Sequence, residues 1–223
     1  MIQPNSITRS KRKTLSITIT KNGEVMVKAP LKMPDVKIDE FIQSKEKWIR
    51  EKLCSINKNL ANFNDVIHYD KLLVFGDKYK PVYADVKKID IDDYGKIMIP
   101  RKYTDSIQVF KATKNWYKRL AKDFVLERVE KLAHYAKLQP NKLRINDSRG
   151  RWGACTHKGE IILNFRVTML PPKLLDYVIF HELSHLVEMN HSAKFWKVMS
   201  TIMPDYLDAR REIKKYGFCL GLF

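Results

Sequence analysis

Cysteine is scarce in this sequence. Cys54, Cys155 and Cys219 are odd in number and far apart, so they give no disulfide framework of the kind that small secreted domains use. The first residues lack the apolar run of a signal peptide, and no stretch reaches the roughly 18 apolar residues of a membrane span. These absences predict a cytoplasmic protein with no membrane partner.

Internal repeats and low-complexity tracts are also missing. The 223 residues, 44% hydrophobic and 30% charged, suit an ordinary globular protein of one large or two small domains.

Acidic residues are few beside basic ones, and the net charge is +17. The excess lies in residues 1–60 and 101–151, which favours an anionic partner such as nucleic acid or a nucleotide on the amino-terminal region and on a predicted long helix. Lysine-rich helical faces that contact only solvent explain the same charge. No helix-turn-helix, RNP or zinc-finger signature supports nucleic-acid binding.

Three of the six histidines gather in the stretch HELSHLVEMNH, residues 181–191. His181 and His185 are four residues apart, so a helix places them one above the other on a single face, where both can bind one metal ion. Glu182 lies one residue round the helix, beside the open position of that ion. Two hydrogen-bonded core histidines at this spacing are the alternative.

The segment before this motif predicts a buried helix. Pro171 and Pro172 mark its start, where a missing N–H costs nothing, and from Leu174 it is apolar on nearly every face. Buried imidazoles and a carboxylate need partners, which a metal ion supplies.

The third ligand, His191, requires a turn after the helix. Astacin- and matrixin-type zincins have the same histidine spacing, with glycine where Glu188 stands in this chain. Asn190 is the nearest residue that tolerates a left-handed conformation. We therefore expect the helix to run to about Met189 and to turn at Asn190, which argues against membership of that secreted group.

The number of ligands predicts the role of the metal. A catalytic zinc keeps three protein ligands and one open position, whereas a structural zinc is closed by four. Three histidines favour a catalytic site, with Glu182 as general base and then acid. Cys155 is the alternative fourth ligand, which would close a structural site and leave Glu182 without a task.

The residues around the motif resemble a known family. The runs RWGAC at 151–155, GEIILNFR at 159–166 and HELSHLVEMNHSAKFW at 181–196 are similar to the YgjP-like metallopeptidases, relatives of the SprT-like zincins. Ala154 departs from the pattern, because serine is commoner there. The resemblance implies zinc bound by His181, His185 and His191, with Glu182 as the catalytic residue.

Residues upstream of the helix are candidates for substrate binding. In zincins, the strand beside the catalytic helix pairs with an extended substrate, and two arginines can bind a carboxylate or phosphate. A core anchor at Trp152 and an ion pair at Arg151 are the structural alternatives. Glu188 is a candidate to orient a ligand imidazole from the second layer of the site. The substrate-binding candidates are Arg149, Arg151, Trp152 and Asn164.

The expected fold is α+β, a zincin-like catalytic domain whose HExxH helix packs on a small mixed sheet. Residues 1–100 are predicted as a β-rich module with one helix, and residues 101–223 as the metallohydrolase domain. Asn22-Gly23 between alternating runs predicts a hairpin. The cap cluster Thr104-Asp105-Ser106, the apolar spacing and the break before Pro140 predict a helix over 106–138. Further strands are expected at 66–69, 72–75, 79–86, 89–91, 97–99, 143–145, 151–155 and 160–165.

Three functions follow from these patterns. The first is a zinc metallopeptidase acting on a peptide or protein. The second is a metal-dependent nucleotide or phosphoanhydride hydrolase, suggested by the charge and by the pair Arg149 and Arg151. The third is a nucleic-acid-associated SprT-like protein. Tyr177, Tyr206, Tyr216 and Arg151 are all candidates to stabilise an oxyanion, and the core is expected to contain Trp196, Met199 and Met203.

Overall fold

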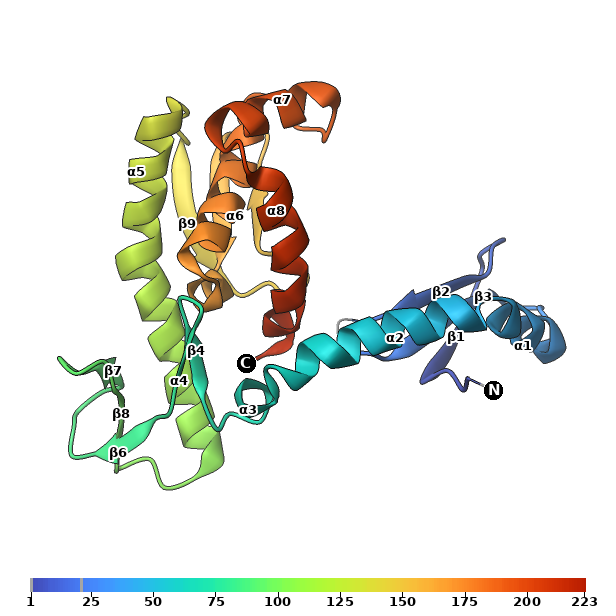
Figure 1. Cartoon of the computed structure of the whole chain (residues 1–223), viewed down its shortest axis with the longest axis horizontal. Helices are drawn as coiled ribbons and strands as arrows, with labels where there is room; N and C mark the ends of the chain where they lie inside the picture. Colours follow the sequence, from blue (N-terminus) through green and yellow to red (C-terminus); the bar gives the residue numbers. More distant parts are fainter. Residues whose placement is uncertain (1, 21) are drawn as a thin grey trace. The chain divides into compact units, whose positions relative to one another are not determined.

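The computed structural model describes residues 2–20 and 22–223. The chain forms two compact units that meet in the sequence at Asn64 and Asp65. Helices accompany several small mixed sheets, as an α+β fold requires (Figure 1). No helix in the described part of the chain is both long enough and apolar enough to cross a bilayer.

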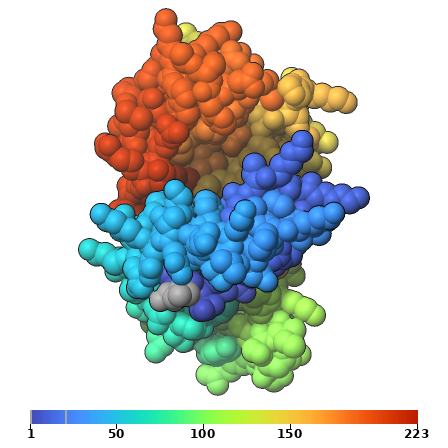
Figure 2. Space-filling model, turned by 90° about the vertical axis from the view of Figure 1, so that its right-hand side faces the viewer, coloured from blue at the N-terminus to red at the C-terminus, as the bar shows by residue number. Residues whose placement is uncertain are grey.

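The amino-terminal unit is a three-stranded sheet with two helices. Its strands are β1 (Ser6–Ser10), β2 (Ser16–Ile19) and β3 (Val25–Pro30), and β3 lies in the middle, antiparallel to β2 and parallel to β1. The helices are α1 (Asp35–Ser44) and α2 (Glu46–Ala61), whose side chains form the light-blue part of the face seen in Figure 2. The predicted single helix is thus interrupted at Lys45.

The predicted hairpin at Asn22-Gly23 is confirmed. Gly23 has φ +84°, a left-handed conformation that glycine adopts without steric cost, and its N–H donates to the carbonyl of Thr20 at 3.1 Å. Alternation along β3 places three side chains on one face, where they join the buried faces of the two helices. This small core consists of Val25, Val27, Ala29, Ile38, Ile42 and Ile49.

The second unit begins well before residue 100, where the sequence predicted a boundary. Two small sheets, β4-β5 and β6-β8-β7, belong to it. The long helix binds them directly, since the Tyr117 hydroxyl donates to the carbonyl of Leu73 at 3.0 Å and Arg119 donates to that of Ile89 at 2.5 Å. These strands are β4 (Leu72–Val74), β5 (Asp77–Tyr79), β6 (Val82–Ala84), β7 (Asp90–Ile91) and β8 (Ile97–Pro100).

One predicted strand is wrong. Residues 66–69 were expected to be extended, but the chain forms the short helix α3 (Asn64–Ile67) and then a left-handed residue, Tyr69, with φ 63°. The Tyr69 N–H donates to the carbonyl of Val66 at 3.1 Å, so the segment closes a turn and cannot join a sheet.

The predicted long helix is confirmed. It consists of α4 (Ser106–Leu120), the π-helical turn η1 (Ala121–Val125) and α5 (Leu126–Ala136). The Asp105 side chain caps its start by accepting from the N–H of Gln108 at 2.8 Å. Lys137, with φ 55°, ends it in the left-handed conformation typical of a helix terminus.

The third sheet of this unit supports the histidine motif. Its order is β10-β11-β9, so β10 is an edge strand, and α6 contacts both β10 and α5. These elements and those that follow are β9 (Lys142–Asn146), β10 (Gly153–Cys155), β11 (Glu160–Asn164), η2 (Phe165–Met169), α6 (Pro172–Ser184), α7 (Ala193–Ile202), α8 (Tyr206–Glu212) and η3 (Ile213–Gly221).

Candidate metal centre

Helix α6 carries the first part of the histidine motif and ends earlier than the sequence predicted. The helix stops at Ser184, and tight turns follow in which Leu186 N–H donates to the Leu183 carbonyl at 3.0 Å and Val187 N–H to the Ser184 carbonyl at 3.1 Å. No left-handed residue is needed: Asn190 is not among the described residues with positive φ. The helix to Met189 and the left-handed turn at Asn190 were therefore wrong.

This early turn brings three histidines together. Ligand nitrogens of His181, His185 and His191 all lie within 4.8 Å of one another, and Nε2 of His181 is 3.0 Å from Nε2 of His191. The three ring centroids are 4.8 to 5.0 Å apart. Such a group can hold one metal ion.

The protonation of these rings suits a cation. Burial, together with the neighbouring His185 and His191, lowers the pKa of His181 to about 3. Burial also lowers the pKa of His185. Both rings are consequently neutral at neutral pH and present lone pairs, the form in which imidazole binds zinc and related transition metals.

The outer nitrogens of these rings differ in their contacts. His185 Nδ1 lies 3.0 Å from the carbonyl oxygen of Glu188, which fixes the orientation of that ring. His181 Nδ1 is buried and has no hydrogen-bond partner among the described residues. The predicted orienting role of Glu188 therefore falls to its backbone, while its carboxylate lies 3.9 Å from Lys194 Nζ.

Glu182 is enclosed beside the histidines. Its side chain is buried, and burial raises its pKa to about 8, against the opposing effect of the nearby Arg151 charge. Gly153 of β10 makes room for it, since a Cβ at Gly153 would lie 2.7 Å from Cγ and Oε1 of Glu182. A side chain at that position would displace the carboxylate.

Cys155 lies outside the histidine group. Its Sγ atom is 3.6 Å from the carbonyl oxygen of Thr156, and it is not among the side chains gathered with the three imidazoles. The geometry therefore favours the three-histidine set over the four-ligand alternative.

The residues predicted to bind substrate occupy different environments. Arg149 and Arg151 are exposed, and Trp152 is half-buried with its carbonyl accepting from the N–H of Asn164 at 2.8 Å. Asn164 is fully buried, and its amide donates to the carbonyls of Ser148 and Arg151. The two arginines are thus available to a ligand, whereas the Asn164 side chain is occupied by the chain itself.

Aromatic residues of α7 and α8 also surround the histidines. Trp196, expected in the core, stacks on His191 with ring centroids 5.7 Å apart, and its Nε1 donates to the His191 carbonyl at 3.1 Å. Tyr206 also stacks on Trp196, at 5.4 Å between ring centroids, and Arg210 lies over the indole at 4.4 Å. Met199 and Met203 are buried as predicted.

Sequence analysis missed Phe195 and Arg210. Phe195 is fully buried and lies within 5.0 Å of all three imidazole rings, measured between centroids. Its position four residues after His191 was the available signal. Arg210 belongs to another helix, and nothing in its local sequence connects it with the histidine motif.

The tyrosine candidates for oxyanion binding separate in the structure. The Tyr177 ring is 6.0 Å from that of His181, and burial raises its pKa. Tyr206 stacks on Trp196, which in turn stacks on His191, so its connection to the metal centre is indirect. Tyr216 is buried in η3, and its pKa is also raised by burial.

A cavity of about 400 Å³ adjoins His185. Its walls come from the residues that follow the ligand, Leu186, Val187 and Met189, and from the turn between β10 and β11, residues 156–159. The cavity therefore lies between the ligand turn and the end of the edge strand.

Comparisons with known proteins give one family match and one solved structure. Residues 13–216 match the YgjP-like family, described as a metallopeptidase domain. Among solved structures, the chain is similar to the metallopeptidase zymogen abylysin of Pyrococcus abyssi, at 24% identity over 41% of this chain and 94% of that chain, with a TM-score of 0.37. No curated protein matches the chain.

The family match defines the class of the protein as a metal-dependent hydrolase. The chain belongs to the YgjP-like family of metallopeptidases.

Proposed function

We propose that the protein is a zincin-like, zinc-dependent peptidase whose ion is held by His181, His185 and His191. The observation that carries this proposal is the gathering of three imidazoles around one point with the buried Glu182 carboxyl beside them. When bound, the ion supplies positive charge that makes water more acidic and a substrate carbonyl more electrophilic.

Glu182 is the proton carrier in this proposal. The positive charge of a bound ion would oppose the effect of burial and favour the ionised form of Glu182. In that form its carboxylate accepts a proton from the attacking water and then delivers it to the departing amine nitrogen. The contact with Gly153 holds the carboxyl in place, because the glycine leaves just enough room for it. Low exposure keeps bulk water from competing for that proton.

The edge strand β10 supports a peptide as substrate. Within the described residues, β10 pairs with β11 alone, so its other edge offers N–H and C=O groups to an extended chain. Helix α6 contacts the same strand, so a peptide added there would pass close to Glu182. Backbone pairing explains recognition of peptides without a deep pocket for the whole substrate.

The test compares the metal-loaded wild type with Glu182→Gln on a peptide library. We expect cleavage by the wild type and a loss of roughly 10²- to 10⁴-fold in kcat/KM in the variant. Zinc binding, measured by titration, should remain, because the three imidazoles are unchanged. Equal cleavage by both proteins would exclude this role of Glu182.

A second candidate is hydrolysis of a nucleotide phosphoanhydride. The exposed Arg149 and Arg151 favour it, since guanidinium groups suit a polyphosphate and the charge of Arg151 acts on Glu182. Offering nucleoside triphosphates beside the peptides separates the two. Loss of triphosphate without peptide cleavage would favour this second function.

Nucleic-acid binding through the basic residues of 1–60 and of the long helix is a further prediction from the net charge of +17. Such binding should weaken steeply with salt. Titration of DNA and RNA at several salt concentrations checks it, and salt-insensitive or absent binding would contradict it.

A further inference from the structure

Arg166 is a charged side chain buried in the interior of the second unit. It is fully buried in η2, two residues after the end of β11, the central strand of the β10-β11-β9 sheet. A buried charge is costly unless its donors are satisfied. Nη1 donates to Asp147 at 2.8 Å, and the Arg166 guanidinium lies 4.3 Å from the Phe165 ring centroid.

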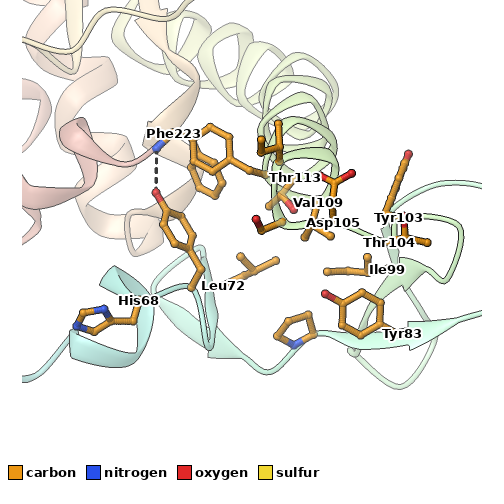
Figure 3. Close-up of a pocket in the computed structure, with 15 residues that line it drawn as sticks. His68, Leu72, Tyr83, Ile99, Tyr103, Thr104, Asp105, Val109, Thr113 and Phe223 are labelled. Atoms are coloured by element: carbon orange, nitrogen blue, oxygen red, sulfur yellow. Dashed lines mark hydrogen bonds between the residues drawn. The ribbon is translucent and has the colours of Figure 1, made fainter.

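The remaining donors of Arg166 hold the segment Leu222–Phe223. Nε donates to the carbonyl of Leu222 at 2.6 Å, and Nη2 to that of Phe223 at 2.7 Å. Phe223 is anchored a second time, since its N–H donates to the Tyr69 hydroxyl at 3.3 Å, the contact drawn as a dashed line in Figure 3. Its ring packs against Phe110 at 5.1 Å.

The side chain of Phe223 thereby forms part of the wall of a cavity of about 690 Å³ (Figure 3). Phe223 lies outside the histidine motif in the sequence, yet its hydrogen bond with Arg166 connects it to the segment between β11 and α6.

Asn164 continues these contacts toward the metal centre. Its Oδ1 accepts from the backbone N–H of Arg166 at 3.0 Å and from Nη1 of Arg166 at 3.2 Å. Its Nδ2 donates to the carbonyls of Ser148 and Arg151. Asn164 therefore holds both ends of the loop formed by residues 147–152, hereafter the arginine loop, which carries Arg149 and Arg151.

The start of the arginine loop is fixed from another side as well. Asp147 lies 2.9 Å from Lys114 Nζ and 3.1 Å from Lys118 Nζ, both on α4. Gly153, which packs against Glu182, follows the loop directly as the first residue of β10. A shift of the loop would thus move Gly153, which leaves room for the side chain of Glu182, the proposed base.

We infer that Arg166 and Asn164 are positioning residues. Through them, the arginine loop adopts its working position only when Leu222–Phe223 is docked, and through Gly153 the same holds for Glu182. The expected effect on the rate rests on the proposed function, whereas the expected effect on the mobility of the loop is independent of it. Neither residue contacts a substrate in this scheme.

The test uses the full, metal-loaded chain and three variants. Asn164→Asp keeps the shape and the acceptor for Arg166 but removes the two donors to the loop. Arg166→Lys keeps a charge but cannot reach all four acceptors of the guanidinium. A chain that stops after Gly221 removes both carbonyls that Arg166 binds. Ile97→Ala, in the fully buried core of β8, is the matched control for lost stability.

Hydrogen exchange of residues 148–152 is the first measurement. We expect faster exchange of the arginine loop in all three variants but not in Ile97→Ala, compared at equal distance below each unfolding temperature. We also expect kcat/KM on a cleaved peptide to fall roughly 10- to 100-fold, with zinc affinity within about twofold of the wild type.

Unchanged loop exchange, or the same change in Ile97→Ala, would overturn the inference. A loop that loosens as expected in a protein whose wild type cleaves no peptide would support the inference and reject the proposed peptidase activity.

Discussion

Gly153 shows how one missing side chain can determine the geometry of a catalytic group. Its neighbour is the carboxyl of Glu182, which occupies the space where a Cβ would lie. Because the backbone conformation at Gly153 is one that any residue adopts, the cost of a substitution there comes from the clash alone.

Gly153→Ala should therefore lower activity more than stability. A Cβ 2.7 Å from Oε1 of Glu182 must displace that carboxylate, and a small misplacement of a catalytic group costs roughly 100-fold in rate. Gly150→Ala is the matched control, because no atom lies within 4 Å of its Cβ. Peptide hydrolysis and thermal unfolding of the two variants give the comparison, and equal kcat/KM would contradict the argument.

Removal of the Glu188 side chain, in contrast to the change at Gly153, should have little effect on the site. Its contact with His185 uses the backbone carbonyl, and its carboxylate makes only weak contacts, at 3.4 Å with Asn190 N and 3.9 Å with Lys194 Nζ. Glu188→Ala should leave the zinc dissociation constant within about twofold of the wild type. A loss of affinity approaching that of His185→Ala would show that the carboxylate takes part after all.

At the scale of elements, the sequence predicted most of the second unit because its signals are local. The Asp105 cap, the apolar periodicity and the break before Pro140 predicted the long helix, and the histidine spacing placed three side chains together. The end of α6 was missed because it depends on successive tight turns that need no glycine or asparagine. Likewise, the helix at 64–67 was missed because apolar residues there resemble a strand.

The buried contacts of Asn164 and Arg166 could not be predicted from sequence either. Their partners are backbone carbonyls far along the chain, and a backbone carbonyl is present at every residue. Only the fold decides which of them an arginine reaches.

Asp147 joins α4, η2 and the arginine loop, and this should appear in the acid stability of the protein. Burial alone would raise its pKa, but hydrogen bonds from Lys114, Arg166 and Lys118 outweigh burial and hold the pKa of Asp147 well below its usual range. A carboxyl whose pKa is lowered by folding stabilises the protein above its unfolded pKa of about 3.9, and this stability is lost as pH falls further.

Asp147→Asn should consequently lower the free energy of unfolding by roughly 1–3 kcal/mol at neutral pH, less than for a wholly buried pair, because the carboxylate is partly exposed. The difference from the wild type should shrink as the pH falls below about 4. Denaturant unfolding at several pH values measures it. Asp208→Asn, which removes only an exposed ion pair with Arg211, is the control and should show little difference at any pH.

At the scale of the whole molecule, the metal centre combines His181 on α6, His185 at the end of that helix and His191 in the turn before α7. His185 is buried and His181 is half-buried, and the lowered pKa of both rings keeps them uncharged when no ion is bound. Loss of the ion therefore leaves no buried charge behind and removes only the free energy of ion binding. Binding to the folded state alone then stabilises that state in proportion to the logarithm of ion concentration.

Removal of the metal should thus lower the unfolding temperature, and restoring it should reverse the change. At a zinc concentration 100-fold above the dissociation constant, the gain is about 2.7 kcal/mol, which corresponds to roughly 5–10 °C for a chain of this size. Scanning calorimetry before and after chelation measures it. In His191→Ala, which lacks one of the three imidazoles, the same zinc concentration should raise the unfolding temperature much less. An equal rise in both proteins would mean that the stabilising ion binds elsewhere, and the histidine group would lose its assignment as the metal centre.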